Sequence, residues 1–206
     1  MAEAINRDHN GARAVAGDRG TVAGGMAGMA DDRVAIRMLG AADLGRYKAL
    51  RDVLLAGYPE AFTSDADIER QRAPETYLAR LAGASANGFP FTLAAWRGER
   101  LVGAVTCERD SRAKVRHIGR VVGMMVDPAL RGAGIGSALL AACVGEVRSR
   151  GGVEMLTLSV TSGNAAAIQL YQRAGFVRYG RLDRALRLGA VYHPKDLMVL
   201  QWPPDA

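Results

Sequence analysis

The glycine-rich stretch of this chain reads Met125-Val-Asp-Pro-Ala-Leu-Arg-Gly-Ala-Gly-Ile-Gly-Ser137. Apolar residues before it predict a strand over 118–126, which Pro128 ends because proline lacks a ladder donor. The residues after it predict a helix over 134–150 that is apolar almost all round and must pack against a sheet. The free N–H groups and positive partial charge at the start of this helix, together with glycines that admit a close ligand, predict a phosphate site.

Two familiar phosphate-binding motifs do not fit this spacing. A dinucleotide fingerprint that begins at Gly132 and Gly134 needs a glycine where Ser137 stands, and no lysine follows as a P-loop requires. Two interpretations remain, a different kind of phosphate loop or glycines that only ease a tight turn and helix–sheet packing.

Strand and helix patterns alternate along the rest of the chain. Predicted strands cover 34–38, 91–96, 101–106, 118–126, 155–160, 176–179 and 197–202. Predicted helices cover 41–55, 65–81, 134–150 and 164–174. This order predicts an α/β chain without internal repeats. Residues 1–31 show no apolar period, so we expect a disordered tail there and a single domain over 32–206.

Composition narrows the class of protein. A hydrophobic fraction of 49% describes a folded domain, and the net charge of +6 fits either a merely basic surface or a phosphate-bearing ligand. The arginines are scattered singly and no apolar run reaches about eighteen residues, so neither nucleic acid nor a membrane is an expected partner. Cys107 and Cys143 lack metal or disulfide spacing. We expect them to be buried small residues in a cytoplasmic protein without a metal.

Three motifs in order give this chain a family resemblance. They are Met125-Val-Asp-Pro128, then Arg131-x-x-Gly134-x-Gly136, then Asn164 followed by Leu170-Tyr171 and Gly175-Phe176. Between Val34 and Leu200 the chain resembles the GNAT acyl-CoA N-acyltransferases. The resemblance implies a twisted mixed sheet flanked by helices, with splayed fourth and fifth strands, and acetyl-CoA as the cosubstrate.

The resemblance also implies the residues that bind acetyl-CoA. The backbone around Met125 and Val126 would bind the pantetheine arm, and Asn164 would contact the same arm. The pyrophosphate would lie on the loop made by Arg131, Gly132, Ala133, Gly134, Ile135, Gly136 and Ser137. From its position alone, Asn164 also fits a helix N-cap, while Gly175 and Phe176 fit a glycine C-cap with its hydrophobic contact.

Tyr171 matches the general acid that protonates the departing CoA thiolate in this family. Its seven-residue distance from Asn164 places both on one helix face. The alternative is a tyrosine that packs its ring in the core.

No general base is evident, because the stretch Val121–Val126 contains no acid. Glu108 and His117 are candidates by position only, and each also fits an ordinary polar residue at the edge of a loop.

Substrate choice is expected to come from the two early helices, including residues 58–62, and from the late segment 186–195. Tyr58, Phe62, Tyr192 and His193 could line an acceptor pocket or pack under a loop. We expect direct transfer of the acetyl group to a small-molecule primary amine in a ternary complex. A protein N-terminus or lysine is the nearest alternative acceptor. A non-catalytic acyl-CoA-binding module is the alternative from another class, and a homodimer is compatible with the resemblance.

Overall fold

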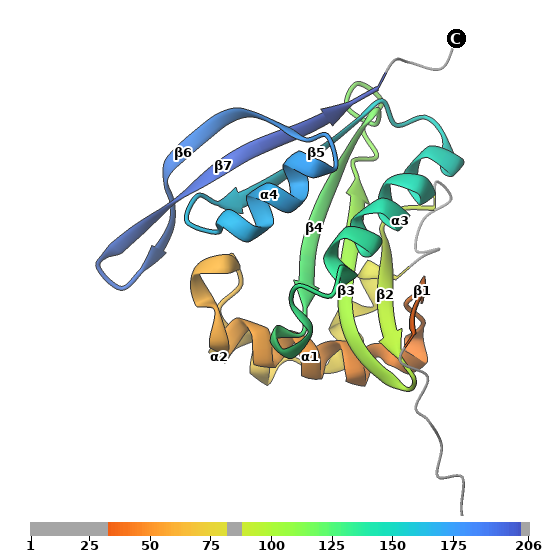
Figure 1. Cartoon of the computed structure of the whole chain (residues 1–206), viewed down its shortest axis with the longest axis vertical. Helices are drawn as coiled ribbons and strands as arrows, with labels where there is room; N and C mark the ends of the chain where they lie inside the picture. Colours follow the sequence, from red (N-terminus) through yellow and green to blue (C-terminus); the bar gives the residue numbers. More distant parts are fainter. Residues whose placement is uncertain (1–32, 82–87, 203–206) are drawn as a thin grey trace, which may run out of the picture. The chain divides into compact units, whose positions relative to one another are not determined.

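The computed structural model describes residues 33–81 and 88–202 (Figure 1). The described residues form one seven-stranded sheet in the order β1-β2-β3-β4-β5-β7-β6. Neighbouring strands are antiparallel except β4 and β5, which run parallel. The expected α/β fold with a mixed sheet flanked by helices is therefore confirmed. The predicted tail, residues 1–31, lies outside the described residues.

The strands in chain order are β1 (Val34–Met38), β2 (Phe91–Arg97), β3 (Arg100–Arg109), β4 (Ile118–Val126), β5 (Met155–Thr161), β6 (Val177–Leu188) and β7 (Val191–Gln201). The α-helices are α1 (Leu44–Gly57), α2 (Ala66–Gln71), α3 (Ile135–Arg150) and α4 (Ala165–Arg173). Short 3-10 helices are η1 (Ala41–Asp43), η2 (Pro59–Ala61), η3 (Pro74–Arg80) and η4 (Pro128–Leu130).

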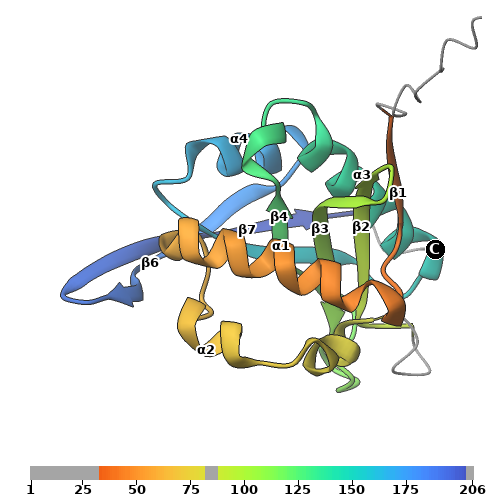
Figure 2. The same cartoon turned by 90° about the horizontal axis from the view of Figure 1, so that it is seen from below.

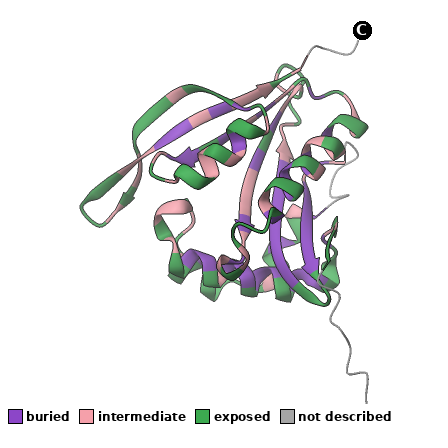
Figure 3. Ribbon diagram, in the orientation of Figure 1, coloured by how far each residue is buried: buried purple, intermediate pink, exposed green. Residues whose placement is uncertain are grey.

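Helices cover both faces of the sheet (Figures 1 and 2). Alternate residues of β2 divide between two core clusters: Phe91 and Leu93 join α3 and α4, whereas Ala94 and Trp96 join α1. Because successive strand residues point to opposite faces, the two clusters lie on opposite sides of the sheet. Figure 3 shows β2 and β3 largely buried, as their nearly continuous apolar runs predict for strands covered on both faces.

Strands β4 and β5 separate along their length, and Figure 1 shows them diverging. They pair only where Ile118 to Arg120 meet Met155 to Thr157. Beyond this point β4 bulges against β3, and Gly123 adopts a φ of +59° that a residue with a side chain rarely takes. The last residues of β4 therefore have no strand partner on the β5 side.

The predicted helix over 65–81 is wrong in extent. The structure has a six-residue α2, then extended backbone at Arg72 and Ala73, then η3. Pro74 disfavours helical geometry in the residue before it and so interrupts the helix. Asp65 caps the short α2 by accepting hydrogen bonds from the amides of Asp67 and Ile68 at 2.9 and 3.0 Å.

The predicted strands 176–179 and 197–202 are too short. They belong to a long hairpin in which β6 and β7 turn at Gly189, whose φ is +57°. Most β6 side chains are exposed, so the strand lacks the alternation of apolar and polar residues that marks a half-buried strand. None of the helices in the described ranges combines the length and apolar character needed to cross a bilayer.

Candidate functional site

The glycine-rich loop ends in a helix N-terminus with free donors. Gly134 is the N-cap of α3, and the first intrahelical bond runs from the Ala138 amide to the Gly134 carbonyl at 3.0 Å. The amides of residues 135–137 precede that bond and are available to a ligand. No acidic residue stands in the first turn of α3 to neutralise the positive end of the helix dipole. This terminus can therefore bind an anion.

The glycines of the loop have two different roles. Gly132 and Gly134 have φ of +84° and +79°, and a Cβ atom on either would meet nothing within 4 Å. A Cβ on Gly136 would instead lie 3.3 Å from Leu170 of α4. Gly136 thus serves the close packing of α3 against α4, while the first two glycines form the open turn in front of the helix.

A large pocket extends from this loop through the gap between β4 and β5. It encloses about 1110 Å³ and reaches from α3 and α4 on one face of the sheet to η2 on the other. The site residues that the sequence predicts along its wall are Met125, Val126, Arg131, Gly132, Gly134, Ile135, Gly136, Ser137 and Asn164. The fold thus brings these residues together, while Ala133 lies in the same loop without lining the pocket.

Asn164 is the N-cap of α4, because its Oδ1 accepts a hydrogen bond from the Ala167 amide at 3.1 Å. The capping interpretation is therefore confirmed. The cap uses only the side-chain oxygen, so the NH₂ group of the same side chain remains available to a ligand in the pocket that Asn164 lines.

Tyr171 lies one residue beyond Leu170, which lines the pocket, and is itself only 7% exposed. Its ring packs against Phe176 in a T-shaped contact at 6.0 Å between ring centroids. Its hydroxyl has no hydrogen-bond partner among the described residues, and burial raises its pKa to about 12. The phenol therefore stays protonated at neutral pH and can act only as a donor of its proton.

Glu108 and His117 do not reach this pocket. Glu108 accepts a hydrogen bond from Arg120 at 2.6 Å and lines a separate hollow of about 460 Å³. His117 stands just before β4, at the end where β4 pairs with β5, and its carbonyl accepts from the Glu154 amide at 2.8 Å. The structure brings neither candidate base to the gap beside Met125.

On the opposite face of the sheet, Tyr58, Glu60, Phe62 and His193 line the pocket. The Arg131 guanidinium lies 4.0 Å from the ring centroid of Tyr58, so it stacks there rather than over the helix terminus. Tyr192, the fourth aromatic or imidazole candidate, lies outside the pocket wall.

Two hydrogen bonds between distant segments were not predicted from the sequence. The Thr161 hydroxyl at the end of β5 donates to the Glu60 carbonyl at 2.6 Å, and the Lys195 ammonium donates to the Thr63 hydroxyl at 2.8 Å. These pairs are 101 and 132 residues apart in sequence, so no local pattern reveals them. They fasten the segment between α1 and α2 to β5 and β7.

The two cysteines are both fully buried, as expected, and neither lines the pocket. Within residues 33–81 and 88–202 no group of three or more histidine, cysteine, aspartate or glutamate side chains is placed to hold a metal ion.

Comparison with known proteins adds independent information. Residues 47–176 match the family model described as Acetyltransferase (GNAT) family. The chain is 44% identical over 62 residues to a mycothiol acetyltransferase of Salinispora arenicola, covering 30% of this chain and 20% of that protein. It is 33% identical over 94 residues to N-alpha-acetyltransferase 30 of Schizosaccharomyces pombe, covering 46% and 62%. The chain thus spans between a fifth and three fifths of these relatives.

Solved structures match over more of the chain. A GNAT-family acetyltransferase from Streptococcus pneumoniae is 27% identical with a TM-score of 0.71, covering 82% of this chain and 100% of that one. An acetyltransferase from Salmonella typhimurium, solved with its cofactor acetyl-CoA, is 20% identical with a TM-score of 0.68 and covers 84% and 96%. The second likeness is one of fold.

Proposed function

The chain belongs to the acetyltransferase (GNAT) family, and from that premise we propose that it transfers an acetyl group from acetyl-CoA to a primary amine. One observation carries this proposal. A single pocket joins an anion-binding helix terminus on one face of the sheet to a second chamber on the other face. A donor with a phosphate-bearing tail and a reactive end can therefore meet an acceptor that enters from the opposite side.

The residues along the pocket fit acetyl-CoA. The free amides at the start of α3 would hold the pyrophosphate, and the open turn at Gly132 and Gly134 leaves room for it. The backbone of Met125 and Val126 has no strand partner on the β5 side and would pair with the pantetheine arm. The NH₂ group of Asn164 would donate to the same arm. When bound, the thioester supplies an acetyl group activated for attack by an amine.

Tyr171 would donate its proton to the sulfur that leaves when the amine attacks. Its burial keeps the phenol neutral, and its hydroxyl is free of partners in the described part of the chain. Proton donation by a positioned side chain contributes about 10²- to 10⁴-fold to a rate. A tyrosine with this placement supports an enzyme over a module that only binds acyl-CoA.

The acceptor that we propose is a small-molecule amine. The Thr161 and Lys195 hydrogen bonds and the stacking of Arg131 on Tyr58 fasten residues 58–63 across the acceptor side of the gap. This arrangement leaves less room for an extended peptide than for a compact amine. The match to N-alpha-acetyltransferase 30 favours a protein N-terminus as the second candidate.

Calorimetry with acetyl-CoA tests the donor site. We expect the wild type to bind, and Gly134→Trp to lose binding because a bulky side chain fills the space before α3. The matched control is Gly98→Trp, since Gly98 also has a positive φ of +56° and open space, but lies in the β2–β3 turn. Loss of binding in both variants, or no binding by the folded wild type, would contradict the proposed site.

Transfer itself is then measured with a panel that contains tyramine, spermidine, an alanine-starting peptide and an N-terminally blocked lysine peptide. Faster acetylation of the free amines than of either peptide is expected. A preference for the alanine-starting peptide would favour the second candidate, and binding of acetyl-CoA without any transfer would favour the non-catalytic module.

A further inference from the structure

Two side chains on the acceptor side of the pocket, Glu60 and His193, have no evident structural role. The charged or titratable groups that line the pocket are Glu60, Arg131, Arg173, Arg181 and His193. Arg131 stacks on Tyr58, and Arg181 pairs with Asp183 at 2.8 Å. The Glu60 carboxylate and the His193 ring have no hydrogen bond or ion pair among the contacts of the described residues, and both are half-buried. Glu60 is the sole acid along the described wall.

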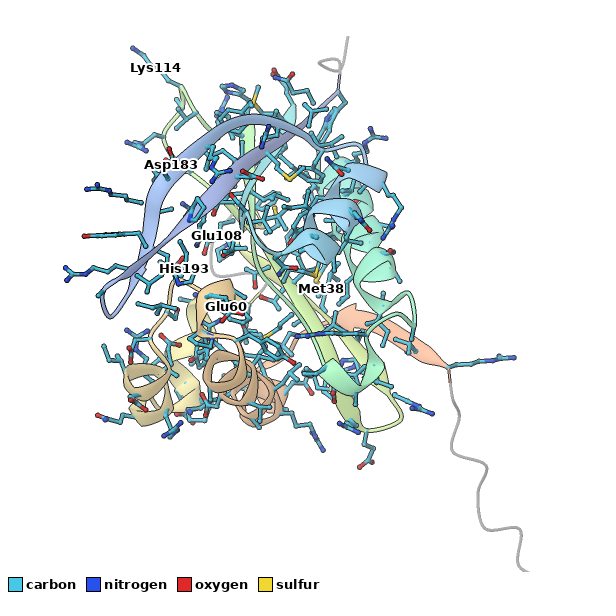
Figure 4. The ribbon with its side chains drawn as sticks, turned by 60° about the vertical axis from the view of Figure 1, so that its left-hand side comes forward. Met38, Glu60, Glu108, Lys114, Asp183 and His193 are labelled. Atoms are coloured by element: carbon cyan, nitrogen blue, oxygen red, sulfur yellow. The ribbon has the colours of Figure 1, made fainter. Side chains whose placement is uncertain are left out.

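Separate elements bring these two side chains to the wall of the same pocket, and both are labelled in Figure 4. Glu60 belongs to η2, and its carbonyl is fastened to β5 by the Thr161 hydroxyl. His193 belongs to β7, and the next residue, Pro194, accepts a hydrogen bond from the Ser162 amide at 2.9 Å. The consecutive residues Thr161 and Ser162 therefore hold the two segments on either side of the end of β5. Both side chains then line the same pocket.

The surrounding charges leave Glu60 and His193 as the groups suited to an amine. Lys195 lies two residues beyond His193 on the same strand, and its ammonium is engaged by Thr63. Burial lowers the pKa of Lys195. Arg131, Arg173 and Arg181 are the other cations that line the pocket, from the glycine loop, α4 and β6. An ammonium ion entering among these cations has one carboxylate to bind.

We propose, building on the proposed acetyl transfer, that Glu60 and His193 form the acceptor-amine site, with Glu60 binding the acceptor as an ammonium ion and His193 taking its proton. The imidazole accepts a proton from the amine nitrogen, and that nitrogen forms a bond to the acetyl carbonyl carbon. The carbon–sulfur bond breaks and the sulfur takes the Tyr171 proton, while the second proton that the nitrogen loses as the amide forms returns the Tyr171 oxygen to a phenol. A neutral imidazole has one ring nitrogen with a free lone pair, which can accept the proton assigned to His193. The acceptor class is therefore an amine that is cationic in solution.

Steady-state kinetics with matched control variants tests the pair. The variants are Glu60→Gln and His193→Gln, and the controls are Glu108→Gln and His117→Gln, which change the same side-chain types outside the pocket. With tyramine, Glu60→Gln should raise KM by about 10- to 100-fold, the worth of one charge-assisted hydrogen bond. His193→Gln should lower kcat about 10²- to 10⁴-fold.

The controls should match the wild type, and none of the four substitutions should change acetyl-CoA affinity. Wild-type kinetics in both Glu60→Gln and His193→Gln, or an equal loss in the control variants, would overturn the proposal.

Binding without turnover separates this proposal from the proposed function. The chain has three histidines, so imidazole NMR signals of the CoA-loaded protein can be assigned by comparison with His193→Gln. Tyramine should shift the His193 signals, and Glu60→Gln should weaken that binding at least about tenfold. An unshifted His193 would overturn the acceptor site. A shifted His193 in a protein that transfers no acetyl group would support the acceptor site while contradicting the proposed function.

Discussion

Tyr171 combines packing and chemistry in one side chain. Its ring contacts Phe176 in the core, and its hydroxyl has no partner among the described residues. Tyr171 itself does not line the pocket, whereas the preceding residue, Leu170, does. A purely structural tyrosine would lose little activity when its hydroxyl is removed, because the ring contact persists in phenylalanine. The two roles therefore separate in a single substitution.

Tyr171→Phe should lower kcat about 10²- to 10⁴-fold while acetyl-CoA affinity stays close to that of the wild type. The ring still packs on Phe176, so the melting temperature should change little. Steady-state kinetics and calorimetry on the same preparations check this. An unchanged kcat would assign Tyr171 to the core alone.

The same substitution should change how stability depends on alkaline pH. Burial raises the pKa of Tyr171 to about 12 in the folded chain, above the ordinary tyrosine value of about 10. The folded state then binds the proton more tightly, so this contribution is complete below pH 10 and is lost as the pH rises toward 12. Urea unfolding in that range should show a shallower loss of stability in Tyr171→Phe than in the wild type.

A buried ionic network positions α1 against α2. Arg51 of α1 donates to Glu69 of α2 at 3.1 Å, and their side chains are 3% and 6% exposed. Burial alone would raise the pKa of Glu69, but hydrogen bonds from Tyr77 and Arg51 hold it below its usual value. Stability from this carboxylate is therefore present above the ordinary glutamate pKa and lost as the pH falls.

Glu69→Ala should lower the free energy of unfolding by about 3–5 kcal/mol, because it leaves Arg51 buried without its carboxylate. Urea denaturation at neutral pH measures the loss. Asp67→Ala is a suitable control, since Asp67 stands on the same helix with its side chain 83% exposed. Equal stability of the two variants would show that the network contributes little.

A hydrogen bond between β5 and η2 holds in place the short helix that carries Glu60, a residue of the proposed acceptor site. Thr161→Val keeps the shape of the side chain but removes its hydrogen bond to the Glu60 carbonyl. The substitution should cost about 1 kcal/mol of stability and should raise the KM for the amine several-fold, because η2 is then less firmly held. The affinity for acetyl-CoA should not change. Kinetics at varied amine concentration, alongside calorimetry, distinguishes these effects.

For the whole molecule, the two faces of the sheet supply different halves of the site. α3 and α4 carry the groups proposed for the donor, whereas η2 and β7 carry those proposed for the acceptor. The gap between β4 and β5 joins the halves because these strands pair over only three residues each.

A ligand that spans this gap should stabilise the folded chain as a whole. Acetyl-CoA at about 100 times its dissociation constant should add about 2.7 kcal/mol to the free energy of unfolding. For a chain of this size that is a rise of roughly 5–10 °C in melting temperature. Differential scanning fluorimetry should show this rise in the wild type and in Gly98→Trp, but not in Gly134→Trp.

Local pattern was sufficient for much of the fold and for the donor side of the site. The strand 118–126 was predicted at its observed bounds. The helix predicted over 134–150 begins one residue before the observed α3, directly after the glycine loop. Asn164 stands one residue before α4 as its N-cap. These features follow from nearby residues: apolar periodicity, glycines with positive φ, a proline and an N-cap. The full length of the hairpin of β6 and β7 was not predicted, because most β6 side chains are exposed and the strand lacks an apolar alternation. The break in the helix predicted over 65–81 was also missed, because Pro74 interrupts the helix despite the apolar pattern.

The sequence by itself determined the family resemblance and the glycine loop before α3, since each depends on short local motifs. Only the tertiary structure decided which side chains share the chamber proposed for the acceptor. It removed Glu108 and His117 from the pocket and brought Glu60 to the same wall as His193, 133 positions along the chain. The physical reason is that these contacts depend on strand pairing and on hydrogen bonds such as that between Thr161 and Glu60, which close only when the sheet forms.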